Sequence, residues 1–151
     1  MREREIRFYY EYEQNGFLSN FYPSPIELDG KSWATVEHYY QAAKTLEPAY
    51  AERIRLAPTA DEAKKLGNDY ACVRRPDWDD YKVMAMRRAL SAKFSQHKYL
   101  ARLLIATGDA ILIENSKKDY YWGIGADETG KNMLGKLLME LRTEFISGRE
   151  Y

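Results

Sequence analysis

Between positions 33 and 44, a carboxylate, an amide and an amine follow one another at helical spacing. Nothing in this segment breaks a helix, and alanines occupy its second half. At about 100° per residue, one stripe of such a helix carries Trp33, Glu37, Gln41 and Lys44, with Tyr40 at its edge. A stripe that mixes aromatic rings with ionisable groups is typical of a ligand pocket. A solvated charged face whose tryptophan touches the core would show the same pattern, so the segment alone leaves both interpretations open.

A second region with chemical potential starts at Asp119 and runs through Trp122 and Gly123 into a glycine-rich loop. We expect a short extended piece at 120–122, followed by a loop that leads to a helix near Asn132. Glycines let backbone amides approach an anion, and a helix start adds partial positive charge. The spacing matches neither a Walker A loop nor the dinucleotide-binding fingerprint, so a flexible surface loop is the favoured interpretation. Asp119 either caps a turn or faces a ligand.

Two smaller clusters complete the set of candidates. Paired arginines at 74–75 and 87–88, with Lys93 nearby, can hold a phosphate by bidentate hydrogen bonds, although a charged cluster is more often a solvated face. Ser19 and Asn20 either bind ligand hydroxyls or form an Asx-type turn. The two histidines, at positions 38 and 97, have no second His or Cys at ligand spacing, so no metal site is predicted.

Short strands and amphipathic helices must position these residues. We expect strands at 6–12 and 110–114, and a strand at 26–28 that turns at Asp29-Gly30 into the helix beginning at Trp33. Further helices are expected at 49–56, 60–67, 78–95 and 99–106, and from about 132 onward, where leucines at helical spacing form a core face. Thr59 opens the second of these with a capping box. The prediction is an α+β fold, a single compact and mainly helical domain over 1–151 with a few short strands.

The bulk composition excludes several classes of protein. The 151 residues carry 23 basic and 23 acidic side chains, so the formal net charge of +0 gives no bulk attraction to nucleic acid or a membrane surface. The single cysteine, Cys72, excludes an intramolecular disulfide framework and fits a reducing compartment. The charged N-terminal segment, 1–7, lacks the apolar stretch of a signal peptide, and no apolar run is long enough to span a membrane. We therefore expect a cytoplasmic protein.

Taken in order along the chain, the motifs resemble those of the NADAR family, also called YbiA-like. The matching segments are 17–23, 33–44, 93–94, 103–109, 119–125 and 130–139, and the resemblance extends from about Phe8 to Phe145. It implies a compact α+β domain with N-glycosidase activity, which cleaves the bond between ribose C1 and an exocyclic amine on a nitrogenous ring. One branch of the family hydrolyses early ribosylamino-pyrimidine 5′-phosphate intermediates of riboflavin synthesis. Another removes ADP-ribose from guanine in DNA.

Carried onto this chain, the resemblance implies a pocket with Glu37 and Lys44 at its centre. We predict Glu37, Lys44 and Asp119 as catalytic residues. The predicted substrate-binding residues are Asn20, Trp33, Tyr40, Gln41, Arg74, Trp122 and Gly123, and no cofactor is expected. A carboxylate near C1 stabilises an oxocarbenium-like state or activates water, whereas a desolvated amine can act as a nucleophile. A Schiff base at Lys44 is slightly favoured over water attack directed by Glu37, and both mechanisms stay open.

The expected substrate is a small phosphorylated ribosylamine, because a chain with zero net charge offers little for extended DNA binding. The alternatives are an enzyme that acts on ADP-ribosylated guanine in DNA and a non-catalytic module that binds ADP-ribose or a related nucleotide. Only an enzyme needs Glu37 and Lys44 together. No membrane partner is expected, and the oligomeric state is not predicted.

Overall fold

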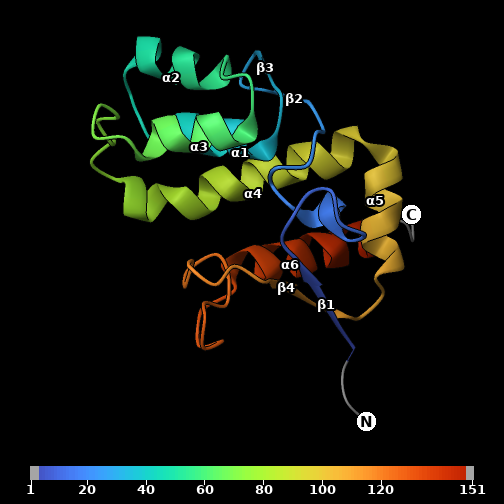
Figure 1. The fold of residues 1–151 in the computed structure, drawn as a ribbon. Coiled ribbons are helices and arrows are strands. Elements are labelled where there is room, and N and C mark those ends of the chain that lie inside the picture. The colour runs from blue at the N-terminus through green and yellow to red at the C-terminus, as the bar shows by residue number, and fades with distance from the viewer. Residues whose placement is uncertain (1–3, 149–151) are drawn as a thin grey trace. The chain divides into compact units, whose positions relative to one another are not determined.

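A computed structural model of the chain describes residues 4–148. The chain forms two compact units (Figure 1). The inserted unit is Pro23–Gln96, and the terminal unit combines the segments on either side of it, Met1–Tyr22 and His97–Tyr151. Residues 4–148 contain six α-helices and four short β-strands, which confirms the predicted α+β class. None of the helices in this range is both long and apolar enough to cross a membrane.

The inserted unit opens with a hairpin of β2 (Ile26–Leu28) and β3 (Lys31–Trp33). The turn residues Asp29 and Gly30 both have positive φ, 56° and 77°, as a two-residue hairpin turn requires. The hairpin is confirmed, but the prediction that a helix begins at Trp33 was wrong. Trp33 pairs with Ile26 in the sheet, and its indole Nε1 donates a hydrogen bond to the Leu28 carbonyl at 2.9 Å.

Helix α1 (Val36–Ala42) starts only after this hairpin, because Thr35 caps it. Thr35 has an extended backbone, and its hydroxyl accepts a hydrogen bond from the His38 amide at 3.2 Å. Helices α2 (Pro48–Arg55), α3 (Ala60–Asn68) and α4 (Trp78–Gln96) pack around α1 (Figure 1). Every residue of α1 is buried. A helix of seven residues depends on such packing for its stability, and its polar side chains are thereby carried into the protein interior.

The terminal unit pairs β1 (Glu5–Phe8) with β4 (Ile111–Glu114) in parallel, in the register Glu5↔Ile111 to Phe8↔Glu114. Helices α5 (Lys98–Ala106) and α6 (Met133–Gly148) pack together, and α6 also covers β4 (Figure 1). The predicted leucine face of α6 is buried at 134, 137, 138 and 141. The first strand is shorter than the predicted 6–12, since its partner has only four residues and the chain then bends away into a short 3-10 helix, η1 (Gly16–Leu18).

Candidate active site

Glu37 and Gln41 lie one turn apart on α1 and are joined by a short hydrogen bond. The Gln41 side-chain Nε2 donates to Glu37 Oε2 at 2.6 Å. The exposed fraction is 6% for Glu37 and 3% for Gln41. The solvated-face interpretation of this helix is therefore wrong. A carboxylate removed from water in this way destabilises the fold unless it is compensated, which is typical of a site that needs the charge for function.

Lys44 follows α1 by two residues, in tight turns that continue the direction of the helix. Only 4% of Lys44 is exposed, and its Nζ donates a hydrogen bond to Asn68 Oδ1 at 2.9 Å, at the end of α3. The amine also lies 5.7 Å from the ring centroid of Tyr40. Burial is the main cause that lowers the pKa of Lys44 to about 8; the positive charge of Arg74 lowers it further, and Glu37 opposes the shift. The neutral fraction of this amine near physiological pH is thus much larger than that of an ordinary lysine.

The predicted arginine cluster divides into residues with different roles. Arg74 is held beside Lys44, because Thr45 and Arg74 form an antiparallel bridge and the Arg75 amide donates to the Lys44 carbonyl at 2.7 Å. The side chain of Arg74 is exposed and makes no ion pair within residues 4–148. Arg75 instead pairs with Asp77 at 2.7 Å. Arg88 is bound by Asp29. Of these three arginines, Arg74 is the one that lies beside Lys44 with an exposed side chain.

Aromatic residues of the predicted stripe have separate environments. Tyr40 is buried, and its ring packs against Trp78 with a centroid separation of 5.2 Å, so it forms an apolar wall beside the Lys44 amine. Trp33 lies in β3 and meets Tyr39 edge-on at 5.1 Å. Trp33 is therefore not on the helix that carries Glu37 and Gln41. A role of Trp33 in substrate binding stays a prediction.

His38 has a structural role in the same helix. Its Nδ1 lies 2.8 Å from the Thr35 hydroxyl, and its Nε2 lies 3.0 Å from the Ala57 carbonyl. Both ring nitrogens are thus engaged within the inserted unit. Across the described part of the chain, no group of three or more His, Cys, Asp or Glu side chains is arranged to hold a metal ion.

In the terminal unit, Asp119 organises the turn that carries Trp122. Its Oδ1 accepts hydrogen bonds from the amides of Tyr121 at 2.9 Å and Trp122 at 2.8 Å. The predicted extended piece at 120–122 is therefore a turn and not a strand, because the Asp119 carboxylate folds the backbone back on itself. Gly123 is tightly enclosed, since an added Cβ would lie 2.7 Å from Glu114 Oε2. Asn20 lies in a comparable turn, in which the Ser19 hydroxyl accepts from the Phe21 amide at 3.1 Å.

The glycine-rich loop does not present the backbone amides at the start of α6 to an anion, and its predicted flexibility stays a prediction. Its amides and those at the start of α6 donate to carbonyl groups of the preceding turn, with N–O distances of 2.7 to 3.1 Å for Gly130, Lys131, Asn132, Met133 and Leu134. Because these donors are already used, the start of α6 has no free amide cradle for a phosphate.

Two candidate residues of the site, Asn68 and Gly67, are not indicated by the sequence. Asn68 binds the Lys44 amine, and nothing in its local sequence marks it. Gly67 was interpreted only as the end of a helix, yet it lies within α3, where an added Cβ would come 2.0 Å from the Gln41 Oε1 atom. Both positions matter through a neighbour that is distant in sequence, so only the packing of α3 on α1 reveals them.

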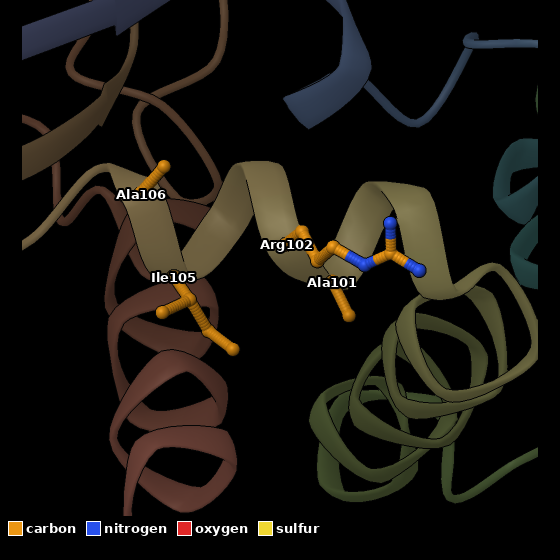
Figure 2. A pocket seen from close by; sticks show the side chains of 4 residues that line it. All are labelled: Ala101, Arg102, Ile105 and Ala106. Atoms are coloured by element: carbon orange, nitrogen blue, oxygen red, sulfur yellow. The ribbon is translucent and has the colours of Figure 1, made fainter. Parts of the chain in front are cut away.

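Two depressions elsewhere lack the paired carboxylate and amine. One, of about 470 Å³, lies on α5 and is lined by Ala101, Arg102, Ile105 and Ala106 (Figure 2). The other, of about 440 Å³, lies between β2 and α4 and includes Arg88, which already pairs with Asp29. Neither offers the acid–base chemistry of the Glu37 region.

The sequence model of the NADAR domain matches residues 7–146. The chain belongs to the NADAR family. That residues 1–151 form one NADAR domain stays a prediction, although the family match runs through both units.

Several relatives align with almost the whole of this NADAR protein. The N-glycosidase YbiA of Escherichia coli is 45% identical over 144 residues, which are 95% of this chain and 90% of YbiA. An N-glycosidase of Nostoc punctiforme is 43% identical, covering 92% of this chain and 91% of the relative. A riboflavin biosynthesis protein of Vibrio vulnificus is 44% identical over 99% of this chain, but this chain spans only 41% of that larger protein. The solution structure of Escherichia coli YbiA matches with a TM-score of 0.90 over 99% of this chain and 89% of YbiA.

Proposed function

We propose that this NADAR protein is an N-glycosidase that hydrolyses the bond between ribose C1 and an amine on a nitrogenous ring. The observation that carries the proposal is the burial of Glu37 and Lys44 in one small region of the inserted unit, with the amine held at a low pKa. Two relatives that match over nine-tenths of their length are named N-glycosidases, which supports the same activity. A module that only binds nucleotides has no need for this pair.

Cleavage of an N-glycosidic bond builds positive charge at C1, and both groups suit that chemistry. The lowered pKa leaves about a tenth of the Lys44 amine neutral at pH 7, compared with well under a thousandth for an ordinary lysine. In the favoured mechanism, this amine adds to C1 of the ring-opened sugar. Glu37 gives a proton to the departing ring amine as the old C–N bond breaks and an imine forms at Lys44. Water then hydrolyses the imine, which releases the sugar aldehyde and restores the free amine.

In the competing mechanism, Glu37 activates water for direct attack on C1, and Lys44 only orients a hydroxyl or phosphate of the substrate. The two mechanisms differ in whether a covalent bond to Lys44 ever forms. The lowered pKa favours the first, because a protonated amine serves equally well for positioning and needs no shift.

The proposed substrate is a small phosphorylated ribosylamine, of the kind that occurs early in riboflavin synthesis. Arg74, exposed beside Lys44, is the proposed phosphate ligand. The riboflavin biosynthesis protein of Vibrio vulnificus, which contains a segment 44% identical to this chain, supports this class of substrate. Asp119 is proposed to assist catalysis. Asn20, Trp33, Tyr40, Gln41, Trp122 and Gly123 are the proposed substrate-binding residues, and the cytoplasm is the proposed compartment.

The test is to incubate the protein with a ribosylamino-pyrimidine 5′-phosphate, in parallel with an oligonucleotide that carries ADP-ribosylated guanine. We expect free base and ribose 5-phosphate from the first substrate, at a higher kcat/KM than for the oligonucleotide. Faster release of ADP-ribose would assign the protein to the DNA-directed branch instead. Unchanged substrates, together with tight binding of ADP-ribose by calorimetry, would refute an enzymatic role.

A further inference from the structure

The amide of Gln41 is held in one orientation by charge. Its Nε2 lies 2.6 Å from Glu37 Oε2, and a carboxylate oxygen accepts hydrogen bonds, so the amine end of the amide must face Glu37. Turning the amide over would bring its carbonyl against the carboxylate. Both side chains are more than nine-tenths buried, so water does not offer Gln41 an alternative partner. The Gln41 amide is therefore a fixed donor to one oxygen of Glu37.

Helix α3 holds the other end of the same amide. Gly67 faces it so closely that a Cβ at position 67 would lie 2.0 Å from Gln41 Oε1, 2.8 Å from its Cδ and 3.0 Å from its Cβ. The buried Oε1 has no hydrogen-bond partner within residues 4–148. A buried carbonyl without a partner destabilises a fold, so stability does not explain this arrangement. The close approach of Gly67 keeps the Gln41 side chain extended toward Glu37.

From these contacts we infer that Gln41 is a positioning residue, clamped by Gly67, which orients the Glu37 carboxylate for proton transfer. The inference rests on the proposed function, in which Glu37 is the catalytic carboxylate. With Oε2 bound by the amide, Glu37 cannot rotate freely about its terminal bond, and its second oxygen keeps a constant direction. Misplacement of an acid–base group by a fraction of an ångström slows proton transfer strongly. Gln41 thus acts on the reaction through Glu37, in addition to any contact it makes with the substrate.

The decisive variant is Gln41→Met, which keeps the length of the side chain and removes the amide. We expect kcat to fall about 10- to 100-fold, the range for loss of a supporting hydrogen bond, while KM changes much less than kcat. In a Glu37→Gln background the same substitution should have no further effect on kcat, because both residues act in one step.

Gly67→Ala provides an independent variant that leaves Gln41 in place. The added methyl group should push the Gln41 amide away from Glu37 and lower kcat as Gln41→Met does. The matched control is Thr59→Ala, which removes the N-cap of the same helix, where the Thr59 hydroxyl accepts from the Glu62 amide at 3.1 Å. Thr59→Ala should lower the melting temperature and leave kcat unchanged. The control separates a local effect on Glu37 from general loosening of α3.

Three results would overturn the inference. A raised KM with normal kcat in Gln41→Met would make Gln41 a direct substrate ligand. Wild-type kinetics in Gln41→Met, while Glu37→Gln is strongly impaired, would reject the positioning role and leave the proposed function intact. Full activity in Glu37→Gln would reject the proposed role of Glu37 and the inference together.

Discussion

Replacement of Lys44 by methionine should stabilise the protein at neutral pH, although the variant loses activity. Methionine keeps the apolar stem of lysine and has no charge to bury. Lys44 is 4% exposed in the wild type, and burial is the main cause that lowers its pKa from 10.5 to about 8. A charged group that must be removed from water in this way weakens the folded state, which is a common consequence of building an active site.

The size of the effect follows from the pKa of Lys44. Since each pKa unit corresponds to about 1.4 kcal/mol, protonated Lys44 lowers the free energy of unfolding at pH 7 by roughly 3 kcal/mol. Methionine cannot replace the hydrogen bond from Lys44 Nζ to Asn68, whose loss offsets about 1 kcal/mol of this gain. The expected net stabilisation is therefore about 2 kcal/mol. For a chain of this length, that raises the melting temperature by roughly 4 to 8 °C.

The pH dependence of the stability difference shows whether the buried charge of Lys44 causes it. The pKa of Lys44 is lower in the folded state than in the unfolded state, so the unfolded chain binds the additional proton at intermediate pH. The destabilisation by Lys44 is therefore fully present below about pH 8, and it disappears as the pH rises to about 10.5. The stability difference between Lys44→Met and wild type should shrink across the same interval.

The assay is urea unfolding of both proteins at pH 7, 8.5 and 10, followed by circular dichroism. Lys44→Arg keeps the buried charge and should show no gain. Lys98→Met, at an exposed position of α5, controls for a general effect of methionine. A Lys44→Met protein that is less stable than wild type at pH 7, or whose gain persists at pH 10, would refute the reasoning.

Three further predictions concern catalysis. Glu37→Gln removes the charge but keeps the shape of the side chain, so turnover should fall about 100-fold or more with an unchanged circular dichroism spectrum; near-normal turnover would exclude Glu37 as the catalytic carboxylate. Trp122→Ala should weaken substrate binding, measured by calorimetry, by roughly 1–3 kcal/mol if the indole stacks on the base, whereas an unfolded variant would show that Trp122 mainly supports the core. Borohydride added during turnover should fix the sugar to Lys44, as located by mass spectrometry, and Lys44→Arg should abolish the adduct. An active arginine variant, with no adduct in the wild type, would favour water attack directed by Glu37.

Local signals predicted a large part of the fold because the physics behind them is local. The Asp29-Gly30 pair specifies a hairpin turn through its positive φ angles, and Thr59 caps α3 through a hydroxyl that reaches an amide three residues on. The confirmed helices begin and end within one or two residues of the predicted bounds, since their caps and prolines act over a single turn.

Two wrong predictions of secondary structure, at Trp33 and after Phe8, have a cause that is not local. Trp33 has a pattern compatible with a helix, but pairing with Ile26 across the hairpin draws it into a strand. The aromatic run after Phe8 has strand propensity, yet its partner β4 ends at Glu114. Strand pairing depends on a second segment, and propensity in one segment does not reveal where its partner stops.

The sequence by itself determined the family, and it brought Glu37, Gln41 and Lys44 into one candidate set, because family motifs and helical spacing are properties of residue order. Only the tertiary structure decided that these groups are buried and that Lys44 has a lowered pKa. It also decided which arginine lies beside that amine, and which glycine clamps Gln41. Burial and electrostatic coupling depend on what other segments place around a group. Gly67, Asn68 and Arg74 each lie more than twenty residues along the chain from the residue that they contact. Short-range sequence patterns therefore do not indicate these contacts.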